Sequence, residues 1–99
     1  MNFNIERTSL ALKKLGFPNL KEIQKATLEQ FKEQDEIVLI APTGSGKTLA
    51  FLLPILESLE KEQITQALII APARELALQI EQVFKSLRTD FKISCCYGG

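Results

Sequence analysis

The 99-residue sequence predicts an α/β fold, in which two N-terminal helices precede a three-stranded parallel sheet. Three observations predict it: three apolar runs of strand length, amphipathic helical patterns between them, and a glycine-rich turn after the first run. The order strand, helix, strand, helix, strand (βαβαβ) with short links implies right-handed crossovers and therefore parallel strands. Ligands of such sheets bind at the carboxyl ends of the strands, so the loops there are expected to lie along one edge.

The two N-terminal helices are predicted from the spacing of apolar residues and from residues suited to helix ends. The first spans residues 5–15, and Gly16 is able to close it in the left-handed conformation. The second is expected to begin at Asn19, which together with Glu22 has the form of a capping box. Both helices therefore precede the first strand.

The first strand, residues 37–41, runs into a turn that has the form of a phosphate-binding loop. Gly44 and Gly46 allow successive N–H groups to face phosphate oxygens, and the following helix adds its N-terminal N–H groups and dipole. Lys47 supplies a charge for the β and γ phosphates, and the Thr48 hydroxyl is placed to bind Mg2+. The whole candidate loop consists of Ala41, Pro42, Thr43, Gly44, Ser45, Gly46, Lys47 and Thr48, with Ala41 where the usual pattern has glycine.

Helices and strands alternate after the loop. The helix that follows it is expected to reach Glu62 and to continue through Pro54, because leucines keep helical spacing on both sides of the proline. Residues 67–71 are predicted to form the second strand, residues 74–88 an amphipathic helix, and residues 92–97 the third strand.

One amide lies in the middle of the apolar face of the second helix. The amide is Gln24, and the face is formed by Leu20, Ile23, Thr27, Leu28 and Phe31. Helix statistics favour a glutamine that reaches solvent or bonds a nearby carbonyl. The alternative is that the amide faces a planar ligand, since its donor and acceptor match N6 and N7 of adenine. A phosphate-binding loop later in the chain favours this second interpretation.

Composition indicates one globular domain or part of one, with 45% hydrophobic residues and few glycines and prolines. Twelve basic and twelve acidic residues cancel, so net charge gives no argument for nucleic acid or membrane. The absence of a signal segment and of a long apolar run predicts a cytoplasmic protein without membrane partners. There is no histidine, and the adjacent Cys95 and Cys96 are expected to be buried free thiols rather than a disulfide or a zinc site.

Four separated segments together resemble the N-terminal part of a DEAD-box RNA helicase. They are similar to the family's Walker A motif (41–48), its Q motif (Gly16-Phe17 and Ile23-Gln24, with Phe3 as the upstream aromatic), its motif Ia (72–77) and its double-glycine motif (98–99). The resemblance covers nearly the whole chain and includes the alanine in the first position of the loop.

The resemblance implies a partial RecA-like P-loop domain with ATP and Mg2+ as cofactors. Phe17 would stack on adenine while Gln24 reads its edge. The loop would hold the triphosphate, with Lys47 and Thr48 serving the γ phosphate and Thr48 binding the metal.

The resemblance also implies contacts with the backbone of single-stranded RNA, which bind without reading sequence. Pro72, Arg74, Gly98 and Gly99 would make them. Ala73 replaces the threonine usual in motif Ia, which removes one hydroxyl from this surface. Without the resemblance, Arg74 is an exposed charge near a helix start.

On this interpretation residues 1–99 are the N-terminal fragment of a helicase ATP-binding domain, with a Q-motif region at 3–31 and a P-loop core at 36–99. The intact protein would remodel RNA by hydrolysing ATP, together with a second RecA-like domain of the same longer chain. The fragment is predicted to be inactive, because it has no Asp-Glu-Ala-Asp motif. Two alternatives stay open: a stand-alone nucleotide-binding or regulatory module, and a DNA helicase of the same superfamily.

Overall fold

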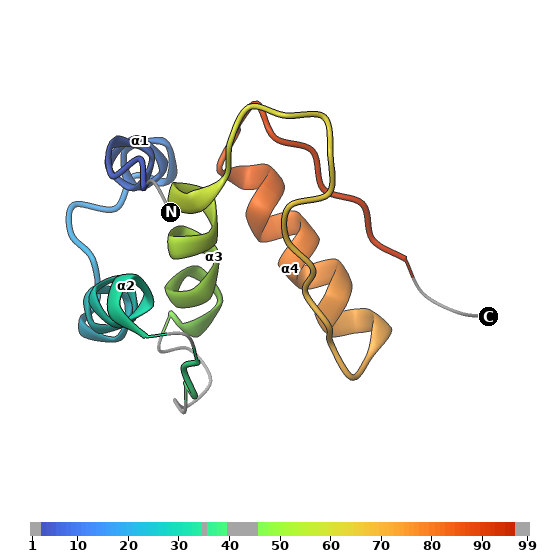
Figure 1. The fold of residues 1–99 in the computed structure, drawn as a ribbon, viewed down its shortest axis with the longest axis horizontal. Helices are drawn as coiled ribbons and strands as arrows, with labels where there is room; N and C mark the ends of the chain where they lie inside the picture. Colours follow the sequence, from blue (N-terminus) through green and yellow to red (C-terminus); the bar gives the residue numbers. More distant parts are fainter. Residues whose placement is uncertain (1–2, 35, 40–45, 97–99) are drawn as a thin grey trace.

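Four helices make up the regular structure of residues 3–34, 36–39 and 46–96, the part of the chain described by the computed structural model. They are α1 (Glu6–Leu15), α2 (Glu22–Glu33), α3 (Lys47–Ser58) and α4 (Arg74–Ser86). In Figure 1, α3 lies in the middle, with α1 and α2 on one side and α4 on the other. The helix that follows the candidate loop is therefore the one against which the other three pack.

The core is built around α3 because this helix is apolar on nearly all sides. The largest fully buried side chains are Leu52, Leu53, Pro54 and Leu56 of α3 and Leu87, the residue that follows α4. As predicted, the helix continues through Pro54, but it ends at Ser58 rather than at Glu62. The Arg7 guanidinium donates hydrogen bonds to the carbonyl oxygens of Leu56 and Leu59, which satisfies acceptors at this helix end.

The predicted three-stranded parallel sheet is wrong for the part of the chain that the structure describes. Residues 36–39, 65–71 and 91–96 contain no β-strand. A central parallel strand is covered on both faces, whereas Val38 and Ile70 are each 85% exposed. An apolar run indicates what a segment can bury but does not supply the neighbouring strand that a ladder needs. Residues 40, 41 and 97 of the predicted strands lie outside the described residues.

Two of these segments keep the two-residue alternation of a strand in their burial. Along residues 91–96, half-buried and exposed side chains alternate, and Ile69 and Ala71 pack on the core while Leu68 and Ile70 are exposed. One face of each segment therefore lies against the helices.

The thiols in the last segment are free, but the prediction that both are buried is wrong, because Cys95 is half-buried and Cys96 is exposed.

Gly16 closes α1 in the left-handed conformation, as predicted, with φ 76°. Its N–H bonds the Lys13 carbonyl oxygen at 3.2 Å, and the N–H of Phe17 bonds that of Leu12 at 2.9 Å. A Cβ added at Gly16 would meet nothing within 4 Å, so only the backbone conformation opposes a side chain there.

We expect Gly16→Ala to lower the free energy of unfolding by about 1 kcal/mol, measured by urea denaturation. Gly16→Asn should cost less, because asparagine tolerates this conformation better than alanine does.

Candidate nucleotide-binding site

The candidate loop is described from Gly46 onward, where it enters α3. Gly46 is the N-cap residue and adopts the left-handed conformation, with φ 87° and ψ 21°. Its carbonyl oxygen accepts the first hydrogen bond of the helix, from the N–H of Ala50 at 3.0 Å. In α-helices generally, the N–H groups of the first turn are the ones available to bind anions. The remaining predicted loop residues, Ala41, Pro42, Thr43, Gly44 and Ser45, lie outside the described residues.

The Gln24 side chain joins the start of α2 to the start of α3. It is buried, and its Nε2 donates a hydrogen bond to the Gly46 carbonyl oxygen at 3.2 Å. Its Oε1 accepts a hydrogen bond from the N–H of Lys21 at 2.9 Å. A Cβ added at Gly46 would lie 2.6 Å from Nε2 of Gln24, a distance at which something must move. Position 46 therefore requires glycine for both its conformation and its closeness to Gln24.

The predicted capping box of α2 is wrong in its register. Lys21, not Asn19, is the N-cap residue, and Gln24 rather than Glu22 occupies the third helical position. In this position the Gln24 amide bonds both the Lys21 N–H and the Gly46 carbonyl oxygen. The Gln24 amide bonds a carbonyl, as the first interpretation has it, and that carbonyl belongs to the candidate loop itself; a contact with adenine stays a prediction.

The other predicted nucleotide contacts differ in exposure. Phe17 is 48% exposed in the connection between α1 and α2. Lys47 is exposed and Thr48 half-buried, both in the first turn of α3. The structure thus brings Gln24, Gly46, Lys47 and Thr48 to one helix start.

The predicted RNA contacts lie at the start of α4. Pro72 and Arg74 are both exposed, and Arg74 is the first residue of the helix. In Figure 1, α3 and α4 both begin toward the lower edge of the view, so their N-termini lie at the same end of the structure. Gly98 and Gly99 lie outside the described residues.

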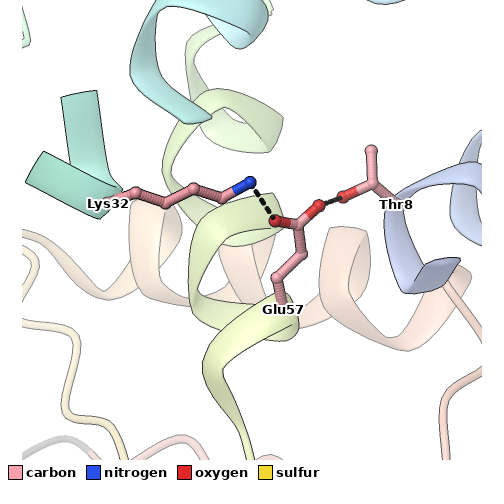
Figure 2. A network of polar contacts seen from close by, with 3 residues as sticks. All are labelled: Thr8, Lys32 and Glu57. Atoms are coloured by element: carbon pink, nitrogen blue, oxygen red, sulfur yellow. Dashed lines mark hydrogen bonds and ion pairs between the residues drawn. The ribbon is translucent and has the colours of Figure 1, made fainter. Parts of the chain in front are cut away.

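Sequence reasoning missed a buried carboxylate at the other end of α3. Glu57 is 3% exposed and contacts Thr8 of α1 and Lys32 of α2 (Figure 2). The signal was present in the sequence, because Glu57 follows Leu53 by one helical turn on a face that is otherwise apolar. A polar residue in that position needs partners, although the pattern does not say which.

The described residues contain neither a metal-binding cluster nor a membrane-spanning helix. No group of three or more cysteine, aspartate or glutamate side chains in them is arranged to hold a metal ion. Among the helices described, none combines the length and the hydropathy that crossing a membrane requires.

Comparison with known protein families gives one match over most of the chain. The family model described as DEAD/DEAH box helicase matches residues 21–99. The matched region includes Gln24, the candidate loop and the start of α4. No solved structure matches the chain significantly.

Curated relatives agree with the family match. The chain is 43% identical to the mouse protein named ATP-dependent RNA helicase DDX55, over 82% of this chain and 14% of that protein. It is 42% identical to ATP-dependent RNA helicase DBP4 of Debaryomyces hansenii, over 95% of this chain and 13% of that protein. It is 43% identical to human ATP-dependent RNA helicase DDX18, over 85% of this chain and 13% of that protein. The chain thus spans about one seventh of the length of these relatives.

Proposed function

Because this chain belongs to the DEAD/DEAH box helicase family, we propose that it supplies the ATP-binding part of an ATP-dependent RNA helicase. The contact between the Gln24 amide and the Gly46 carbonyl oxygen carries the proposal, since an amide that could pair with adenine lies beside a residue of the candidate loop. On this proposal residues 1–99 belong to a helicase ATP-binding domain, with the Q-motif region at 3–31 and the P-loop core at 36–99.

The proposed nucleotide site uses backbone and side chains at the start of α3. Residues 41–46 would surround the phosphates, and the conformation and lack of a Cβ at Gly46 suit that close approach. Lys47 would pair with the γ phosphate and Thr48 would bind Mg2+, which neutralises phosphate charge when present.

The adenine would be recognised by side chains on the α2 side of this helix start. Phe17 would stack on the base. The Gln24 amide has two N–H groups and two acceptor positions, of which the bonds to Lys21 and Gly46 use one each. This leaves the chemical capacity for a donor and acceptor pair toward N6 and N7 of adenine.

The proposed RNA surface lies around the start of α4. Pro72, Arg74, Gly98 and Gly99 would contact the phosphate backbone of single-stranded RNA. In the intact protein, a second helicase domain would complete the ATP site and couple hydrolysis to RNA remodelling. A cytoplasmic location stays a prediction.

Nucleotide binding by the purified protein and its Lys47→Ala variant tests the proposal. We expect Lys47→Ala to weaken the binding of a fluorescent ATP analogue by about 10- to 100-fold, because a charge-assisted bond to phosphate contributes about 1.5–3 kcal/mol. Lys61→Ala is the matched control, since Lys61 is an exposed lysine beyond α3. Equal affinities of all three proteins would contradict the proposed site.

The same preparation tests the predicted lack of turnover. The 99 residues contain no Asp-Glu-Ala-Asp segment to hold the metal and the attacking water. We therefore expect no Mg2+-dependent phosphate release from ATP. Release that Lys47→Ala abolishes would show that this chain hydrolyses ATP by itself.

Nucleotide preference tests the role given to Gln24. Equal affinities for ATP and GTP would remove that role and favour a helicase without a Q motif.

A further inference from the structure

A buried carboxylate lies at the opposite end of α3 from the candidate nucleotide site. Glu57 is 3% exposed and occupies the last turn of the helix that begins at Lys47. At 1.5 Å per residue, the two positions are about 15 Å apart along the helix axis. Burial of a carboxylate is unfavourable unless hydrogen bonds and opposite charges compensate, so its partners decide its role.

The partners of Glu57 come from two other helices. The Thr8 hydroxyl of α1 donates a hydrogen bond to Oε2, and the Lys32 Nζ of α2 lies 3.8 Å from Oε1 (Figure 2). Oε1 accepts no hydrogen bond in the described part of the chain, so the Lys32 ammonium is the charge that it faces there. One side chain of α3 therefore contacts both N-terminal helices.

Aromatic contacts fix the Lys32 end of α2 further. The Lys32 Nζ lies 5.7 Å from the centre of the Phe3 ring, and Phe3 packs edge-on against Phe31 with ring centres 6.1 Å apart. The N–H of Asn4 donates to the main-chain oxygen of Glu57 at 2.7 Å. The segment before α1 and the end of α2 thus meet at Glu57.

Helix α2 has polar contacts with α3 near both of its ends. Gln24 contacts Gly46 near the start of α2, and Lys32 contacts Glu57 near its end. The apolar packing between the two helices is non-directional, whereas two polar contacts about 12 Å apart fix the position of α2 along α3 and its rotation. Of the two polar contacts described between α2 and α3, loss of the one at Glu57 leaves the one made by Gln24.

We infer that Glu57 is a positioning residue for the nucleotide site. Its carboxylate holds α1 and α2 on α3 and thereby keeps the Gln24 amide against the Gly46 carbonyl oxygen. The inference rests on the proposed ATP site, because adenine preference is the property that Gln24 would provide. Glu57 itself touches neither nucleotide nor metal.

The test compares adenine preference in the purified protein and its variants. We measure the dissociation constants of fluorescent ATP and GTP analogues for wild type, Glu57→Ala, Glu57→Gln and Gln24→Ala. We expect Glu57→Ala to lower the preference for ATP over GTP by about fivefold or more, toward the value of Gln24→Ala. The Glu57→Ala/Gln24→Ala double variant should lose no more than Gln24→Ala alone, because both act through one amide. Glu57→Gln keeps the shape and the capacity to bond Thr8 and should fall between wild type and Glu57→Ala.

Controls separate positioning from a loss of overall stability. Glu62→Gln removes a charge at an exposed site and should leave the preference unchanged. Lys32→Met keeps the length of the side chain without its charge and should reproduce Glu57→Gln. An equal loss of ATP and GTP affinity in Glu57→Ala, or additive losses in the double variant, would overturn the inference.

Hydrogen exchange separates failure of this inference from failure of the proposed function. If wild type binds neither nucleotide, the proposed ATP site fails, but exchange without nucleotide still decides the role of Glu57. We expect Glu57→Ala to speed amide exchange in the first turn of α2 more than in the middle of α3. Unchanged exchange in that turn would overturn the positioning role.

Discussion

Replacing Gly46 by alanine is expected to weaken binding at the proposed ATP site strongly and to destabilise the fold. The new Cβ would lie 2.6 Å from Gln24 Nε2 and 3.0 Å from Lys21 Cδ, at a φ of +87°. The left-handed conformation costs an alanine about 1–2 kcal/mol. Displacement of Gln24 would break its hydrogen bond to Gly46, and buried polar groups left without a partner cost about 1–3 kcal/mol. We therefore expect a loss of about 2–5 kcal/mol in the free energy of unfolding, measured in urea.

Gly16→Ala is the matched control for this substitution. Gly16 also has a positive φ, but a Cβ there meets nothing within 4 Å. For stability, Gly16→Ala measures the cost of the left-handed conformation without a clash, whereas Gly46→Ala should in addition raise the dissociation constant for ATP by more than about 100-fold. Equal effects of the two substitutions on stability, with ATP affinity kept in both, would show that the contact between Gln24 and Gly46 has no part in binding.

Leu53→Ala is expected to have the largest effect on stability without touching the candidate site. Leu53 is fully buried in the middle of α3, the helix against which the other three pack. Truncating a buried leucine costs about 2–5 kcal/mol, a large share of the total of about 5–15 kcal/mol typical of a domain. We expect a lower urea midpoint with an unchanged slope.

Leu10→Ala is the control for Leu53→Ala, because Leu10 is an exposed leucine on α1. Its free energy of unfolding should change by no more than about 0.5 kcal/mol. A loss at Leu53 as small as that at Leu10 would contradict the assignment of α3 as the centre of the core.

Local features of the fold were predictable because their causes lie close together in the chain. Gly16 ends α1 in the left-handed conformation, since glycine adopts it without a Cβ penalty. Helix α3 continues through Pro54 because leucines on both sides of the proline share one buried stripe. The sheet was mispredicted because strand pairing depends on a distant neighbour, which the apolar runs at 37–41, 67–71 and 92–97 do not specify.

The candidate site was predictable in part. The loop motif and the Gln24 amide pointed to the same helix start, and the structure has a hydrogen bond between Gln24 and Gly46. The roles of Phe17, Lys47 and Arg74 stay predictions. The network of Glu57, Thr8 and Lys32 was missed, because the partners of a buried polar residue come from other helices and leave no local pattern.

The carbonyl oxygen of Gly46 accepts two hydrogen bonds, one from the Ala50 N–H and one from Gln24 Nε2. A carbonyl has two lone pairs, so this single atom serves both the first turn of α3 and the attachment of α2. Rotation of the peptide after Gly46 would redirect both bonds at once. A ligand that favours one orientation of this peptide therefore also changes the equilibrium constant for the attachment of α2 to α3. By thermodynamic reciprocity, attachment of α2 changes the affinity for that ligand by the same factor.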